Sequence, residues 1–212
     1  MKKLFFFWSC FIWIGALASN PPTALAAPFS VSIDTSSLSG SAAQLAFDLI
    51  DGDGAINNSA IISGFSTDGT LGSSTSTGGV SGNLPGAVTL SDSEFFNELL
   101  QMITLGSFID FALDLTSNFA GGIPDSFSFF ILDDATPPSS SLVTTDLLGD
   151  ALFIIDIDGT ALGAVFVASQ SEPSVPVTLT SRQVPEPGAI LLLALGLPLI
   201  SLRNLIVRHR SQ

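Results

Sequence analysis

The side chains best suited to chemistry lie in one short run, DLIDGDGAINN, at residues 48–58. Five of them carry oxygen donors, namely Asp48, Asp51, Asp53, Asn57 and Asn58. Hard oxygen ligands at this density suit Ca²⁺. The run therefore predicts a calcium site, with Asp51, Asp53 and Asn57 as the candidate ligands.

An ordinary tight turn is the alternative for the same run. The sequence departs from the EF-hand pattern, because Ala55 occupies the third ligand position and no glutamate closes the loop. Aspartate and glycine are also the residues that build tight turns without any metal, and Gly52 and Gly54 fit that role. On sequence alone, the turn is favoured over the metal site.

Histidine- and cysteine-based catalysis is excluded by the side chains that the body lacks. Residues 27–181 contain no His, Cys, Tyr, Trp or Lys, and His209 is the only histidine of the chain. A Ser-His-Asp triad, Cys-His catalysis and a histidine-bearing zinc site are therefore impossible there. We expect no catalytic residues and no cofactor other than the calcium already considered.

Carboxylates remain as the only acid–base groups, and two of them can in principle hydrolyse a glycosidic bond. Asp133 and Asp134 are candidates for such a pair, although carboxylates on a solvated acidic surface are the favoured explanation. Aromatic platforms of Trp or Tyr for stacking sugars are absent. A carbohydrate-active enzyme or a carbohydrate-binding module that works through carboxylates is the alternative function.

The charge of the body excludes whole classes of partner. All 19 acidic residues and a single base, Arg182, lie between residues 27 and 187, which gives this part a net charge of −18. Such a surface repels nucleic acid and anionic lipid, so neither is expected as a partner of the body.

Short apolar runs separated by turn residues predict an all-β body, an antiparallel, jelly-roll-like β-sandwich. FSVSID and IDFALDL alternate between apolar and polar residues, as half-buried strands do, and SFSFFILDD and ALFIIDIDG are nearly continuous apolar runs typical of central strands. LGAVFVAS and PVTLT complete the expected set.

Three segments are expected to lie outside the strands. SDSEFFNELLQMI (91–103) places Phe95, Leu99 and Met102 on one helical face after a Ser-x-x-Glu capping box, which predicts one short helix. The polar run at 71–86 predicts a long loop. Residues 170–184, which contain two prolines, predict the connection from the body to the tail.

The N-terminus has the three parts of a secretory leader. Lys2 and Lys3 form a positive region, residues 4–18 are apolar, and Ala24-Leu25-Ala26 supplies the small residues of a signal-peptidase site. We expect cleavage between Ala26 and Ala27 and export of the chain.

The C-terminus combines an apolar run with a basic end. Residues 188–202 would form a helix of about 22 Å, and adding residues 204–207, with Arg203 snorkelling, extends it to the roughly 30 Å of a hydrocarbon core. Arg203, Arg208 and Arg210 then stay on the cytoplasmic side. The sequence predicts a transmembrane helix.

The residues before that helix are Val184, Pro185, Glu186 and Pro187. This motif, the apolar helix and the arginine-rich end together resemble the PEP-CTERM sorting signal of exported bacterial proteins. The resemblance implies recognition by an exosortase, a membrane-embedded protease, and an association with exopolysaccharide. FSVSIDTSSLSG, FDLIDGDGAINNS and FFNELLQMITLGSFIDFALDLT together resemble an ectodomain family of PEP-CTERM proteins that brings no assigned activity.

These expectations divide the chain into a signal peptide (1–26), a β-sandwich ectodomain (27–172), a linker (173–183) and a sorting signal (184–212). The expected function is that of an exported, non-enzymatic surface or matrix protein of a Gram-negative bacterium. Its expected partners are signal peptidase, the exosortase and exopolysaccharide. The tail would anchor it only transiently in the inner membrane.

Overall fold

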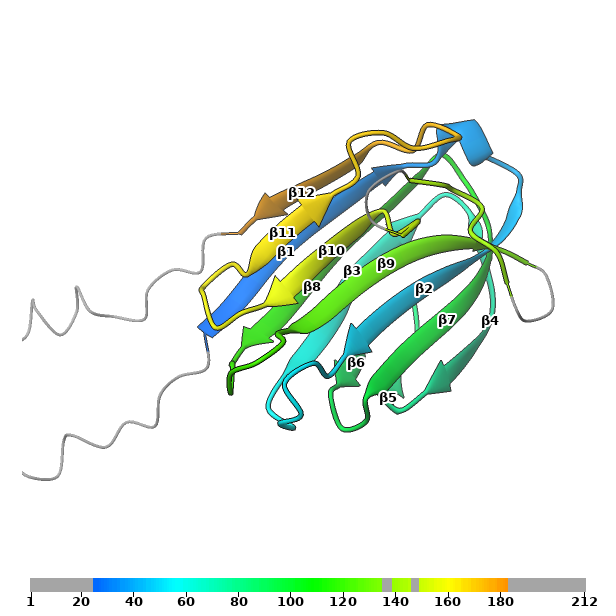
Figure 1. Ribbon diagram of the computed structural model, residues 1–212. Coiled ribbons are helices and arrows are strands. Elements are labelled where there is room, and N and C mark those ends of the chain that lie inside the picture. The colour runs from blue at the N-terminus through cyan, green and yellow to red at the C-terminus, as the bar shows by residue number, and fades with distance from the viewer. Residues whose placement is uncertain (1–24, 135–138, 146–148, 183–212) are drawn as a thin grey trace, which may run out of the picture. The chain divides into compact units, whose positions relative to one another are not determined.

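The computed structural model describes residues 25–134, 139–145 and 149–182 (Figure 1). Twelve β-strands and one three-residue 3₁₀ helix, η1 (Ser36–Leu38), make up the regular structure of these residues. Within the described ranges, no helix has the length and apolar character needed to cross a lipid bilayer. The predicted transmembrane helix and sorting signal lie outside them.

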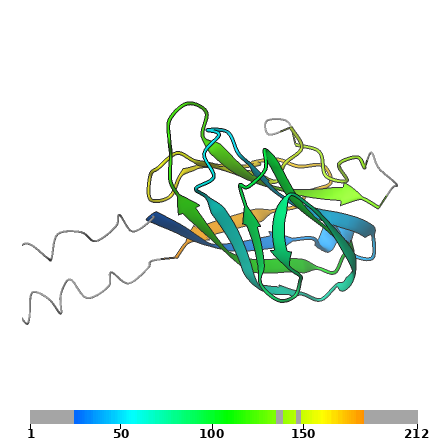
Figure 2. The same cartoon turned by 90° about the horizontal axis from the view of Figure 1, so that it is seen from below.

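The strands form two six-stranded antiparallel sheets that pack as a sandwich, seen as two layers in Figure 2. The β1 sheet has the order β12 (Val177–Ser181), β1 (Leu25–Asp34), β8 (Phe108–Ser117), β3 (Ser59–Thr67), β6 (Val88–Ser91) and β5 (Gly79–Gly82). The β2 sheet has the order β11 (Ala164–Val167), β10 (Phe153–Ile157), β9 (Asp125–Asp133), β2 (Ala42–Ile50), β7 (Phe96–Thr104) and β4 (Thr70–Thr77). The predicted antiparallel β-sandwich is confirmed.

Phenylalanine fills the centre of the space between the sheets. The ring of Phe47 on β2 meets those of Phe111 and Phe129 edge-on, at centroid distances of 5.6 and 5.0 Å. Phe129 also stacks on Phe153, with 5.6 Å between centroids. Such aromatic contacts add to the burial of apolar area and fix the spacing of the two sheets.

Alternation of apolar and polar residues correctly predicts the strands that line this core. Along β8, Ile109, Phe111 and Leu113 are buried, while the residues between them are half-buried on the outer face. The predicted runs at 29–34, 126–134 and 151–159 likewise fall on β1, β9 and β10. A period of two residues is the signature of a sheet with one buried face.

The predicted helix at 91–103 is wrong. Residues 96–104 form strand β7, which pairs with β2 on one side and β4 on the other. Leu99 and Ile103 turn into the core, whereas Phe95, assigned to the helical face, is 74% exposed in the preceding loop. Two long partner strands provide ladder hydrogen bonds that outweigh a weak local helical preference.

The predicted loop at 71–86 is also wrong over most of its length. β4 and β5 occupy it, and each lies at one edge of a sheet. β4 is almost wholly exposed, and its residues are mainly serine and threonine. An edge strand pairs through its backbone on one side only, so it needs no apolar face, and a polar surface protects the edge from other chains.

The expected linker, 173–183, contains the last strand of the domain. Val177–Ser181 form β12, which pairs with residues 29–33 of β1. Val177 and Leu179 pack against the core, so the sandwich extends to Ser181. The alternation in PVTLT, which predicted a strand, describes this segment better than its two neighbouring prolines do.

The first strand of the sandwich starts and its last strand stops at the same end of the domain. Leu25, where β1 starts, pairs with Ser117, and Ser181, where β12 stops, pairs with Phe29 (Figure 1). β3 also starts at this end, because Ala60 pairs with Leu115. We call it the loop end, and it includes the β2–β3 loop that contains DGDG.

Candidate metal centre

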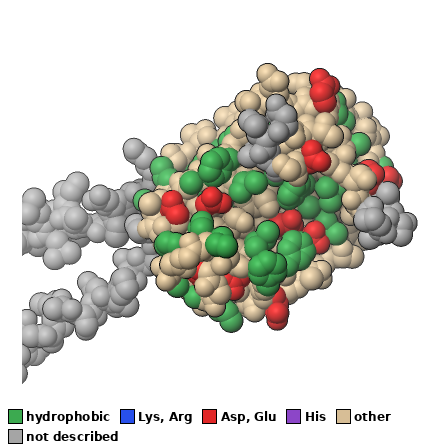
Figure 3. Space-filling view, in the orientation of Figure 1, with side chains coloured by type: hydrophobic (Ala, Val, Ile, Leu, Met, Phe, Trp, Pro, Cys, Tyr) green, Lys and Arg blue, Asp and Glu red, His purple; other side chains and the backbone are tan. Residues whose placement is uncertain are grey.

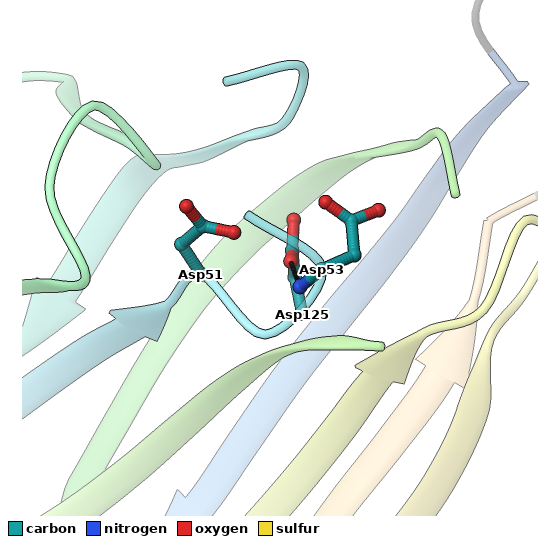
Figure 4. A group of neighbouring side chains, drawn as sticks. All are labelled: Asp51, Asp53 and Asp125. Carbon is teal, nitrogen blue, oxygen red and sulfur yellow. Dashed lines mark hydrogen bonds between the residues drawn. The ribbon is translucent and has the colours of Figure 1, made fainter. Parts of the chain in front are cut away.

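Three carboxylates gather at the loop end. Asp51 and Asp53 come from the β2–β3 loop, and Asp125 is the first residue of β9. One carboxylate oxygen from each lies within 4.8 Å of the others. Figure 4 shows Asp51 on one side of the turn and Asp53 and Asp125 on the other. We call these three residues the acidic cluster.

Backbone amides hold the acidic cluster in place. Asp125 Oδ1 accepts hydrogen bonds from the amides of Gly52 and Asp53, at 2.8 and 3.2 Å. Asp51 Oδ1 accepts from the Gly54 amide at 2.7 Å, and Asp53 Oδ2 accepts from the Ala120 amide at 2.7 Å. The loop is therefore wrapped around a buried carboxylate, since Asp125 is only 1% exposed.

The two glycines of DGDG are required by this wrapping. A side chain at Gly52 would overlap the carbonyl oxygen of Pro124, because the loop passes directly over the start of β9. Gly54 has a φ of +76°, a conformation that other residues adopt at a cost. The expected tight turn is thus present, and it brings the carboxylates together.

A fourth carboxylate, Asp92, lies beneath the same loop. It follows β6 and is 1% exposed, and its Oδ2 accepts from the amides of Asn57 and Asn58 at 2.9 and 2.6 Å. Its other oxygen, Oδ1, is buried without a hydrogen-bond partner. Burial raises the pKa of Asp92, and the negative charges of Asp125 and Asp51 raise it further, although the two amides oppose this.

The two asparagines of the run have different roles. Asn58 is buried and donates from Nδ2 to Asp125 Oδ2 at 2.7 Å, while its Oδ1 accepts from the Asn118 amide at 2.9 Å. It therefore joins the β2–β3 loop to the β8–β9 loop. Asn57 Oδ1, by contrast, is buried without a hydrogen-bond partner, like Asp92 Oδ1.

The site offers oxygen donors, and no positively charged side chain of residues 27–181 compensates their negative charge. Residues 27–181 contain no Lys, Arg or His, so no side chain of the body can neutralise these carboxylates. A hard divalent ion such as Ca²⁺ prefers carboxylate and amide oxygens in this number, whereas zinc prefers nitrogen and sulfur. Of the predicted ligands, the structure brings Asp51 and Asp53 together and places Asn57 in the same loop.

Asp125 and Asp92 belong to the same network but were not predicted from the sequence. Asp125 is 73 residues from the amide that it binds at Gly52, and Asp92 is 34 residues from Asn58. Only strand pairing brings such distant residues together. A signal for Asp125 did exist, because an aspartate directly after Gly-Gly-Ile-Pro opens a strongly apolar strand.

Asp48 lies apart from the acidic cluster, although it opens the run. It sits on the outer face of the β2 sheet, where its cross-strand partners are Glu98 and Ser128. Its Oδ1 is buried without a hydrogen-bond partner. Burial raises the pKa of Asp48 to about 7, and the charge of Glu98 adds to the effect.

The surroundings of Asp48 explain its burial. Figure 3 shows hydrophobic side chains interspersed with acidic ones on the face turned toward the viewer. Across the outer face of the β2 sheet, half-buried apolar residues such as Leu100 and Phe130 alternate with core residues of the same strands. Asp48 therefore has little water around it, and Glu98, whose pKa is also raised by burial, shares this environment.

The other predicted site residues are only partly visible. Ala26 and Ala27, the expected signal-peptidase site, are the second and third residues of β1, and their backbones pair with Thr116 and Leu115 of β8. The sorting motif, Val184, Pro185, Glu186 and Pro187, lies outside the described residues, as do the basic residues Arg203, Arg208 and Arg210.

Comparison with known proteins identifies no family for this chain. No protein-family model, no curated protein and no solved structure matches this chain.

Proposed function

We propose that this chain is an exported, non-enzymatic surface or extracellular-matrix protein that a PEP-CTERM/exosortase system sorts. The sandwich would be the mature, functional part, and the two terminal segments would direct it through signal peptidase and the exosortase. Its role would be structural or adhesive, in association with exopolysaccharide.

The observation that carries this proposal is the order of features after the last strand. β12 ends at Ser181, and the motif Val184–Pro187 follows within three residues, before the apolar run and the arginines. In the sequence, the motif thus comes just after the last strand of the described residues. A protease acting there would separate the tail while leaving both sheets intact.

The arrangement of the N-terminus supports the same proposal. Cleavage after Ala26 would remove only the first two residues of β1 and leave the strand from Ala27 to Asp34. Its core residues Phe29, Val31 and Ile33 would all remain. Processing at both ends is therefore compatible with one unchanged core.

A jelly-roll-like arrangement of the strands and a non-enzymatic role are both part of this proposal. A jelly-roll-like arrangement is supported by the way that β1, β2, β3 and β4 alternate between the two sheets. A non-enzymatic role is supported by the absence of His, Cys, Tyr, Trp and Lys from residues 27–181, which leaves no nucleophile–base pair of the usual kinds.

The sorting proposal is tested by replacing Pro185, Glu186 and Pro187 with alanine in the native host. We expect the variant to be exported but retained in the inner membrane, because the protease loses its recognition segment. Fractionation and mass spectrometry of the new termini measure the outcome. Ser211→Ala with Gln212→Ala is the matched control, which should be sorted normally. Normal release of the triple variant would contradict the proposal.

One observation favours a second candidate, a carboxylate-based carbohydrate-active enzyme. Asp48 and Glu98 face each other across β2 and β7, and directly opposed residues of antiparallel strands have Cβ atoms about 4.5–5.5 Å apart. A retaining glycosidase needs one protonated and one ionised carboxyl group at similar separation. The candidate ranks second because Asp48 is buried, which keeps it from a substrate oxygen. If the protein hydrolysed glycans and Asp48→Asn abolished this activity, the carbohydrate-active enzyme would become the favoured function.

A further inference from the structure

We propose that Asp51, Asp53 and Asp125 form a calcium site, completed by oxygens of Asp92 and Asn57, which fastens two loops and the start of β9 at the loop end. This inference goes beyond the sorting function and does not depend on it. The site joins the β2–β3 loop, the β6–β7 loop and the start of β9.

The first observation is the convergence of charge. Carboxylate oxygens of Asp51, Asp53 and Asp125 approach within 4.8 Å of one another. Asp125 is buried, and every base of the chain lies outside residues 27–181. Like charges at this separation repel each other strongly in a partly desolvated site. A bound divalent cation would convert that repulsion into attraction.

The second observation is independent of the first and concerns two oxygens with no partner. Asp92 is 1% exposed, and its carboxylate is directed at the β2–β3 loop, because Oδ2 binds the loop amides of Asn57 and Asn58. Its Oδ1 and the Oδ1 of Asn57 are both buried and make no hydrogen bond. Buried polar atoms are nearly always satisfied in folded proteins, so these two unsatisfied acceptors, one from each of two loops joined by hydrogen bonds, are available to a cation.

The donor set identifies the class of ion. All five groups offer oxygen, four as carboxylates and one as an amide, which is the ligand chemistry of Ca²⁺. Because the donors come from a loop, a second loop and a strand end, their arrangement is irregular. Ca²⁺ accepts irregular coordination by six to eight oxygens, whereas Mg²⁺ requires a near-octahedral shell and retains its waters.

The expected consequence is mechanical coupling of the loops. The β2–β3 loop is already joined to the β8–β9 loop through Asn58 and to Asp92 through two amides. A cation shared by Asp51, Asp53 and Asp125 would add a stronger link between the same elements. If Ca²⁺ binds only the folded state, free Ca²⁺ at a hundred times the dissociation constant multiplies the folding equilibrium constant by about a hundred.

The test uses the full chain purified in detergent and treated with chelator. Isothermal titration with CaCl₂ measures binding directly, and thermal unfolding is followed by far-UV circular dichroism, since residues 27–181 lack Trp and Tyr. We expect one site per chain, with a dissociation constant of about 10⁻⁴ to 10⁻³ M, as in extracellular calcium modules. The melting temperature should rise more in CaCl₂ than in NaCl or MgCl₂ of equal ionic strength.

Two variants separate ligation from folding. Asp51→Asn keeps the oxygen that accepts from the Gly54 amide, and Asp53→Asn keeps one of the two oxygens that accept from the amides of Ala55 and Ala120. The domain should therefore fold in both variants, but each should weaken Ca²⁺ binding at least tenfold. Asp110→Asn, on the outer face of the β1 sheet, removes the same charge and should bind Ca²⁺ normally. Equal effects of CaCl₂, MgCl₂ and NaCl, or unchanged binding in both cluster variants, would overturn the proposal.

Discussion

Replacing Asp48 with asparagine isolates the energetic cost of burying one carboxylate in the outer face of the β2 sheet. The folded protein holds the proton of Asp48 up to a pH of about 7, whereas the unfolded chain releases it near 3.8. Between these two values, the folded state binds more protons than the unfolded state. The free energy of unfolding must therefore fall as the pH rises through this window.

The magnitude follows from the width of the window. Each pH unit between 3.8 and about 7 costs about 1.4 kcal/mol, or about 4 kcal/mol in all. The contribution of Asp48 to stability is complete below pH 3.8 and is lost by about pH 7. Asparagine carries no charge at any pH, so the variant should not lose stability for this reason.

The assay is urea unfolding, followed by circular dichroism, of the wild-type and variant chains in parallel. A range from about pH 5 to 8 avoids precipitation near the isoelectric point of 4.1. Over this range, the stability of Asp48→Asn should rise relative to the wild type by about 3 kcal/mol. Carboxylates that do not interact with Asp48 titrate equally in both chains and cancel in the difference, which leaves Asp48 and the neighbouring Glu98.

Two further variants check the cause. Asp110→Asn removes the same charge from the outer face of the β1 sheet and is the matched control for the change in net charge. Glu98→Gln should shift the window of Asp48 to lower pH, because the charge of Glu98 is the second cause of the raised pKa. A stability difference between Asp48→Asn and wild type that stays constant with pH would refute the desolvation argument.

Two further predictions concern the core and the start of β7. Phe47→Ala should lower the free energy of unfolding by about 3–5 kcal/mol, because it opens a cavity among fully buried rings, whereas Phe95→Ala, at a side chain 74% exposed, should change it little. Asn97→Ala should cost about 1–3 kcal/mol, since buried Asn97 accepts from the Gly79 amide at 2.7 Å and donates to the Glu94 carbonyl at 2.7 Å. Urea titration measures each value, and a neutral Asn97→Ala would contradict the role given to these bonds.

The sequence correctly predicts those strands in which apolar and polar residues alternate. Residues 29–34 of β1 and the whole of β8 alternate so regularly that their buried faces can be assigned residue by residue. β7 shows the limit of this approach, because Phe95, Leu99 and Met102 match a helical period while Asn97 and Gln101 place amides on the buried face of a strand. Apolar spacing alone could not resolve that conflict, since the neighbouring strands decide it.

The same distinction applies to the candidate site. Asp51 and Asp53 could be identified because they are two residues apart and a turn brings them together. Asp125 and Asp92 could not, because their positions depend on the pairing of β2 with β9 and of β3 with β6. Local spacing predicts part of a site, and sheet topology supplies the residues that complete it.

The pairing of β12 with β1 also determines how the domain would carry tension. β12 is an edge strand that contacts β1 along five residue pairs, from Val177 to Ser181. A force applied at Ser181 along the strand axis, outward from the loop end, loads those pairs in parallel, as shear, and would have to break them together. A perpendicular force would peel them apart one by one. A tether that left Ser181 in line with the strands would therefore load β12 in shear against β1 instead of peeling it away.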